Sequence, residues 1–106
     1  MRKTIRIQVA LASVVLLAGA VSFAQSGEAT YKAKCQSCHG AAGVPNPGIA
    51  KMMGVKPATD ADVKSKTEAQ MIAATANGMG KMQPFKGKIT DAQIKDAVDY
   101  FRTFTK

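Results

Sequence analysis

Every cysteine and histidine of this chain falls within one five-residue stretch. The 106 residues contain two cysteines and a single histidine, and these are Cys35, Cys38 and His39 in the sequence CQSCHG. Thiol and imidazole groups are the side chains that most often bind metals or act as nucleophiles near neutral pH. Their gathering in one place predicts that the chemistry of the protein depends on this stretch.

Three chemistries are compatible with Cys-x-x-Cys-His. A thiol–disulfide exchanger carries Cys-x-x-Cys in a βαβ setting, but no strand pattern flanks the motif here. A zinc site needs four ligands, and because the chain has no further Cys or His, an Asp or Glu would have to complete it. The third chemistry is covalent haem attachment, for which Cys-x-x-Cys-His is the attachment sequence.

The spacing of the motif favours haem. Residues three apart lie on the same side of a helical turn, so Cys35 and Cys38 can each bond one vinyl group of a haem. The adjacent His39 then places an imidazole nitrogen under the iron. We therefore expect one covalent haem c with its iron ligated by His39, and the exchanger and the zinc site remain the alternatives.

The N-terminal segment is typical of an export signal. Residues 1–24 begin with Arg2, Lys3 and Arg6, continue with an apolar run over 7–21, and end in the small residues of Ser22-Phe23-Ala24. A membrane anchor is the alternative, but the apolar run is shorter than the roughly 20 residues of a membrane span. We predict a signal peptide over 1–24, a domain over 25–106, a periplasmic location and no stable membrane insertion after cleavage.

The mature chain is small and basic. Cleavage leaves 82 residues with 12 basic and seven acidic side chains. An exported protein meets little nucleic acid, so the charge favours an acidic protein partner or solubility. A domain of this size rarely stabilises itself with its own core, and a disulfide across Cys35 and Cys38 would close only a very small loop. Haem would supply the missing core, and we expect the haem-free chain to be largely unfolded.

Three main helices are expected, joined by long loops. The first runs from a Ser26 cap to about Cys35, and residues 40–67 are rich in Gly and Pro, with short turns near 49–53 and 60–64. Capping boxes at Thr67 and Thr90 open two further helices, the first of which continues through residue 76. The last helix has an apolar stripe of Ile94, Ala97, Val98 and Phe101. The pattern predicts an all-α fold.

The mature chain resembles small class I bacterial cytochromes c over nearly all of its 82 residues. The resemblance rests on CQSCHG near the start, NGMGKMQPF beyond the middle and an aromatic-bearing last helix. It implies a class I fold wrapped around one covalent haem. It also implies that the first and last helices cross at a small residue and an aromatic, which match Gly27, Tyr31 and Tyr100.

The second axial ligand is expected to be a methionine. Met79 lies between two glycines, and Met82 precedes Gln83-Pro84-Phe85, where Phe85 can pack on the ring. The family places its iron-binding methionine in a Gly-x-Gly-x-Met-Pro-x-Phe stretch, which matches Met82, although Gln83 stands where proline often follows. Met79 is the second candidate.

The resemblance also implies an acceptor for the second nitrogen of His39. Family members use a downstream proline carbonyl, and Pro47 is the first candidate, with Pro45 the second.

A haem held by His and Met has no open site for substrate, so the sequence predicts a monomeric one-electron carrier and not an enzyme. Lysines near the two motifs are expected to form a basic rim that meets an acidic surface on a redox partner; they are Lys32, Lys34, Lys81, Lys86 and Lys88. The alternatives are a small haem subunit of a dehydrogenase or oxidase complex, and an open-site peroxidase or gas-binding cytochrome.

Overall fold

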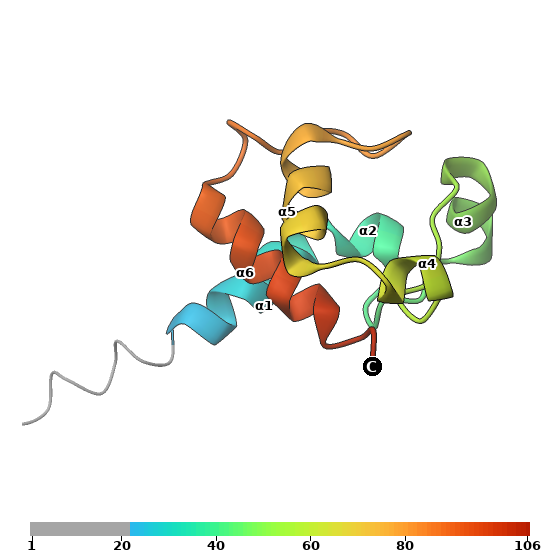
Figure 1. Ribbon diagram of the computed structural model, residues 1–106, viewed down its shortest axis with the longest axis horizontal. Coiled ribbons are helices and arrows are strands. Elements are labelled where there is room, and N and C mark those ends of the chain that lie inside the picture. Colours follow the sequence, from blue (N-terminus) through green and yellow to red (C-terminus); the bar gives the residue numbers. More distant parts are fainter. Residues whose placement is uncertain (1–21) are drawn as a thin grey trace, which may run out of the picture.

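Over residues 22–106, the chain folds into six helices joined by loops (Figure 1). The computed structural model describes residues 22–106. The helices are α1 (Ser22–Lys34), α2 (Gln36–His39), α3 (Pro47–Met53), α4 (Ala61–Lys64), α5 (Glu68–Asn77) and α6 (Asp91–Arg102). Within these residues there is no strand, and extended backbone pairs only in two isolated bridges. The all-α prediction is confirmed, and residues 1–21 of the predicted signal lie outside the described part.

The first and last helices cross in close contact, as Figure 1 shows for α1 and α6. A Cβ atom added to Gly27 would lie 2.5 Å from the backbone oxygen of Asp96. Only glycine allows the two backbones to approach so closely. The expected crossing at a small residue is therefore present.

An aromatic cluster extends from this crossing to the C-terminus. Tyr31 is only 1% exposed, and its ring centroid lies 5.2 Å from that of Tyr100 and 5.8 Å from that of Phe104. Tilted aromatic pairs at such distances stabilise a core beyond the area they bury. This cluster fixes the end of α1, where the Cys-x-x-Cys-His motif begins.

Helices α5 and α6 begin where the capping boxes predict. Thr67 accepts a hydrogen bond from the Gln70 amide at 3.1 Å, and Gln70 accepts one from the Thr67 amide at 2.9 Å. Thr90 and Gln93 repeat the same pair of bonds. The two helices then pack together around a buried cluster. It consists of Met71, Ile94 and Val98 from the helices and Phe85 from the loop between them.

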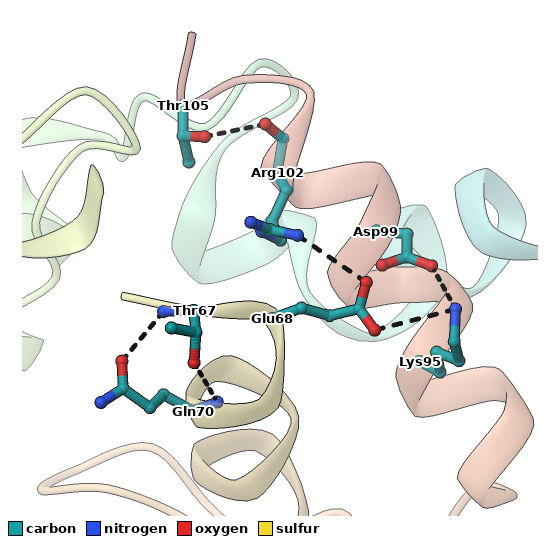
Figure 2. A network of polar contacts seen from close by, with 7 residues as sticks. All are labelled: Thr67, Glu68, Gln70, Lys95, Asp99, Arg102 and Thr105. Atoms are coloured by element: carbon teal, nitrogen blue, oxygen red, sulfur yellow. Dashed lines mark hydrogen bonds and ion pairs between the residues drawn. The ribbon is translucent and has the colours of Figure 1, made fainter. Parts of the chain in front are cut away.

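A group of charged side chains links α5 to α6 on the surface. Figure 2 shows Glu68 between Lys95 and Arg102. The Glu68 carboxylate oxygens lie 3.8 Å from Nζ of Lys95 and 3.7 Å from Nη1 of Arg102. Lys95 also pairs with Asp99 at 2.8 Å along α6. Glu68 lies at the N-terminal end of α5, where a carboxylate is favoured by the helix dipole.

Residues 40–67 form loops with two short helices, as expected. Asn46 caps α3 by accepting a hydrogen bond from the Gly48 amide, and Asp60 caps α4 by accepting one from the Asp62 amide. The segment returns to the body of the protein where the Ala58 amide donates to the Gly43 carbonyl at 2.8 Å.

The expected N-cap at Ser26 is wrong. Helix α1 begins at Ser22, four residues earlier, so Ser26 lies inside the helix. Residues 22–25, directly before Ser26, contain neither Gly nor Pro. Nothing in the local sequence therefore stops the helix from extending toward the N-terminus.

Candidate haem site

The Cys-x-x-Cys-His motif lies on a short helical turn that follows α1. The Cys35 amide donates to the Tyr31 carbonyl at 2.8 Å, and the His39 amide donates to the Cys35 carbonyl at 2.9 Å. Cys35 is the N-cap of α2, which carries Cys38 and His39. The turn places all three residues on the lining of one cavity.

This cavity has a volume of about 680 Å³. The cavity is lined by five of the six residues predicted for the site, which are Cys35, Cys38, His39, Met82 and Phe85. Its volume is in the range of cofactor pockets. Helices α5 and α6 contribute an apolar wall of Met71, Ala97, Val98 and Phe101.

The His39 imidazole is held by aromatic packing and lacks a polar partner. Phe101 packs against it with 5.3 Å between ring centroids. Nδ1 is buried and makes no hydrogen bond to any described residue, which is uncommon for a buried polar atom. Burial lowers the pKa of the imidazole, which favours the neutral form that binds metals. The ring therefore fits a ligand of an iron bound in the cavity.

Pro47 does not line this cavity. It is exposed and occupies the first turn of α3, where its fixed φ suits a helix start. The expected hydrogen bond from His39 to the Pro47 carbonyl is not formed among the described residues, since Nδ1 has no partner there. Pro45, the second candidate, is buried. The identity of the acceptor stays a prediction.

A tight backbone turn carries the two candidate methionines. The Met79 amide donates to the Met82 carbonyl at 3.1 Å, and the Met82 amide donates back at 2.9 Å. Gly80 within the turn has a φ of 56°, a left-handed conformation that glycine adopts most readily. Both methionines line the cavity, but Met79 is 54% exposed, whereas Met82 packs against the buried cluster.

The Cys35 thiol lacks the properties of a reactive cysteine. Burial, followed by the proximity of Cys38, raises the pKa of the Cys35 thiol to about 11. Thiol–disulfide exchangers instead lower this pKa to populate the thiolate. The environment thus argues against the exchanger alternative.

Several residues that line the cavity were not predicted as site residues from the sequence. The segment before α5 contributes Lys56, Ser65 and Lys66, and the loop after α3 contributes Gly54 and Val55. Lys34 and Lys81 also line the cavity, and the acidic Asp62 on its wall pairs with Lys56. The wall therefore has an excess of positive charge, which suits the two carboxylates that a haem carries.

Two cysteines, one histidine and a methionine around an apolar cavity in a helical fold define a small c-type cytochrome with one haem. A family model described as "Cytochrome C oxidase, cbb3-type, subunit III" matches residues 22–101. The chain belongs to this family of cytochrome c domains.

Individual relatives agree with this classification. The chain is 34% identical to a cytochrome c6 from Leptolyngbya boryana over 77 residues, which cover 73% of this chain and 87% of the relative. It is also similar to the solved structure of the KustC0563 c-type cytochrome, with a TM-score of 0.67, 29% identity, and coverage of 76% of this chain and 98% of the other.

The family assigns the cofactor and the general activity. The protein binds haem c covalently, with its iron. It is an electron carrier that exchanges electrons with redox partners, and it is not an enzyme. No helix within residues 22–106 is long and apolar enough to cross a membrane.

Proposed function

We propose that this protein is a periplasmic one-electron carrier whose haem is bonded to Cys35 and Cys38 and whose iron is ligated by His39 and Met82. The observation that carries the proposal is that all four side chains line one cavity. Bound haem supplies an iron that gains and releases one electron, and a thioether ligand raises its reduction potential. The chain attaches the ring, orients the imidazole and excludes water.

Met82 is the better of the two methionine candidates. Its backbone is fixed by two hydrogen bonds to Met79, and its side chain packs against the cluster that includes Met71 and Phe85. Phe85, 6% exposed and on the cavity wall, is positioned to contact the ring. Met79 also lines the cavity but is 54% exposed.

The ligand assignment is tested by comparing Met82→Ala with Met79→Ala. Loss of the far-red sulfur–iron absorption in Met82→Ala, with its retention in Met79→Ala, is the expected result. An unchanged absorption in Met82→Ala would overturn the assignment. Carbon monoxide should bind the reduced Met82→Ala protein but not the reduced wild type, because only the variant has an open iron face.

We further propose that the partner presents an acidic surface to the cavity mouth, and that the carrier is a monomer. Lys34 and Lys81 of the predicted basic rim line the cavity, and Lys66 adds to them. Lys32 instead pairs with Glu28 at 2.8 Å. The reaction rate with an acidic partner should fall steeply with ionic strength; a flat dependence would contradict this docking mode.

The periplasmic location rests on the predicted signal. Cleavage after Ala24 would leave a mature chain that still contains Gly27 and the rest of the crossing. Mass spectrometry of the holoprotein should give an N-terminus at Gln25, recovered in the periplasmic fraction. An intact N-terminus in the membrane fraction would contradict the signal assignment.

A second candidate function follows from the description of the matching family. That description names an oxidase subunit, so the chain could serve as the small haem subunit of an oxidase complex. Purification from native membranes and soluble fractions separates the two: a carrier is recovered alone, and a subunit is recovered with larger haem proteins.

A further inference from the structure

The turn that carries Met82 has an anchor on a distant part of the chain. Nζ of Lys81 donates a hydrogen bond to the backbone oxygen of Met52 at 2.7 Å, across a separation of 29 residues. In Figure 1 the loop that follows α5 extends toward α3, whose last residues include Met52. Lys81 is the immediate neighbour of Met82 in the sequence.

The acceptor is a carbonyl group that needs a partner. Helix α3 ends at Met53, so the Met52 oxygen has no amide four residues ahead inside the helix. Lysine side chains near a helix C-terminus bond such carbonyls and favour the negative end of the helix dipole. The contact therefore has a physical basis on both sides.

The bond joins two segments that both contribute to the lining of the haem cavity. Lys81 and Met82 line it from the turn, and Met53 and Gly54 line it from the end of α3. A bond between these segments holds the turn against α3. Because the turn is closed by two backbone hydrogen bonds between Met79 and Met82, fixing Lys81 also fixes the backbone of Met82.

We propose that Lys81 is a positioning residue for Met82: its bond to the Met52 carbonyl keeps the Met79–Met82 turn over the haem and the Met82 sulfur at the iron. This inference rests on the proposed ligation by Met82. It gives Lys81 a role beyond the charge that it contributes to the docking surface.

The test measures how readily an external ligand replaces Met82. Imidazole binds the ferric holoprotein only when the methionine has left the iron, so its apparent affinity reports the population of the open state. Lys81→Met keeps the aliphatic stem and removes the donor. Lys86→Met, an exposed lysine of the same loop, is the control that removes the same charge. Lys81→Arg retains a donor at the same position.

Lys81→Met should bind imidazole about fivefold more tightly than the wild type, the factor that corresponds to a hydrogen bond of about 1 kcal/mol. Lys86→Met should stay within about twofold of the wild type, and Lys81→Arg should lie closer to the wild type than Lys81→Met does. The free energy of global unfolding should fall in Lys81→Met by a similar amount, because the bond stabilises the closed native state relative to both the open and the unfolded states. It should stay near the wild-type value in Lys86→Met, whose side chain is exposed.

Equal imidazole affinities in Lys81→Met and Lys86→Met would overturn the proposal, because the effect would then be one of charge alone. A loss of global stability in Lys81→Met with no rise in imidazole affinity would also overturn it, because the bond would then stabilise the fold without keeping Met82 on the iron. If Met82→Ala keeps the sulfur–iron absorption, the ligand assignment fails and this role fails with it. If Met82→Ala loses the absorption but Lys81→Met behaves as the wild type, only the role of Lys81 fails.

Discussion

The Tyr31 hydroxyl donates a 2.6 Å hydrogen bond to the carbonyl oxygen of Gly40, the residue directly after His39. Tyr31 lies in α1 at the crossing with α6, and Gly40 ends the turn that carries the haem-binding motif. One side chain therefore joins the helix crossing to the backbone beside the predicted iron ligand. Ionisation of the Tyr31 hydroxyl should therefore affect both the helix crossing and the turn that carries His39.

The stability of the protein should decrease at alkaline pH through Tyr31. Burial raises the pKa of its hydroxyl from 10.0 to about 12, so the folded state favours the neutral form. This stabilisation is fully present below pH 10 and is lost as the pH rises from 10 to 12, at a cost of about 2 kcal/mol. Urea unfolding of the holoprotein at pH 8 and at pH 11.5 measures the loss.

Tyr31→Phe provides the matched comparison. At pH 8 it should be about 1 kcal/mol less stable than the wild type, because the Gly40 carbonyl loses its donor. Between pH 8 and 11.5 it should lose less stability than the wild type, because it lacks the hydroxyl that titrates. Stability changes that come from lysine titration are shared by both proteins and cancel in the comparison. Equal losses in the two proteins would show that Tyr31 does not titrate in this way.

Gly27→Ala should destabilise the protein by about 1–3 kcal/mol through the helix crossing. In a free helix alanine is the better residue by roughly 1 kcal/mol, but here its Cβ would lie 2.5 Å from a backbone oxygen of α6 that cannot rotate away. The denaturation midpoint of the holoprotein gives the value. Ala29→Ser, on the exposed face of the same helix, should change stability by less than about 0.5 kcal/mol. A Gly27→Ala protein as stable as this control would mean that the helices can separate at little cost.

Removal of haem should unfold the protein. Replacing Cys35 and Cys38 with alanine prevents covalent attachment and takes the ring out of a cavity of about 680 Å³. At about 24 cal/mol per Å³, even a third of that volume corresponds to roughly 5 kcal/mol, as much as many small domains possess in total. The far-UV circular dichroism of the double variant should show mostly unfolded chain. A cooperative thermal transition with wild-type helicity would contradict this expectation.

Thr90→Ala should cost about 1 kcal/mol by removing the cap of α6. The Gln93 amide then loses the Thr90 hydroxyl that accepts its hydrogen bond, and α6 carries Ile94 and Val98 of the buried cluster. Chemical denaturation measures the change. Thr59→Ala, at an exposed loop position, is the control and should be nearly neutral; equal stabilities of the two variants would argue against the capping contribution.

Features set by neighbours in the sequence could be predicted, as the capping boxes at Thr67 and Thr90 illustrate. Each box consists of residues three apart whose side chains bond each other's backbone, so no distant residue decides the outcome. The attachment motif is local in the same way, since one helical turn brings Cys35 and Cys38 together. The start of α1 was mispredicted because Ser26 has the chemistry of a cap, but the chain before it also supports a helix.

Contacts between distant segments could not be predicted from residue types. The Lys81 bond ends on a backbone carbonyl, and every residue has one, so nothing at Met52 marks it as the acceptor. The packing of Phe101 against His39 likewise depends on where α6 lies relative to α2. The apolar stripe showed that Phe101 faces inward but not which side chain it meets.

The placement of the two cysteines also constrains the order in which the protein matures. Cys35 directly follows α1, its thiol is partly covered, and α1 is pressed against α6 without room for a methyl group at Gly27. In a folded chain, the two thiols to which the ring attaches would already form part of the cavity wall. Because the haem-free chain is expected to be largely unfolded, we expect thioether formation to take place on the open chain, before the first and last helices meet. In this order of maturation, the protein would fold around a haem that is already attached to the chain.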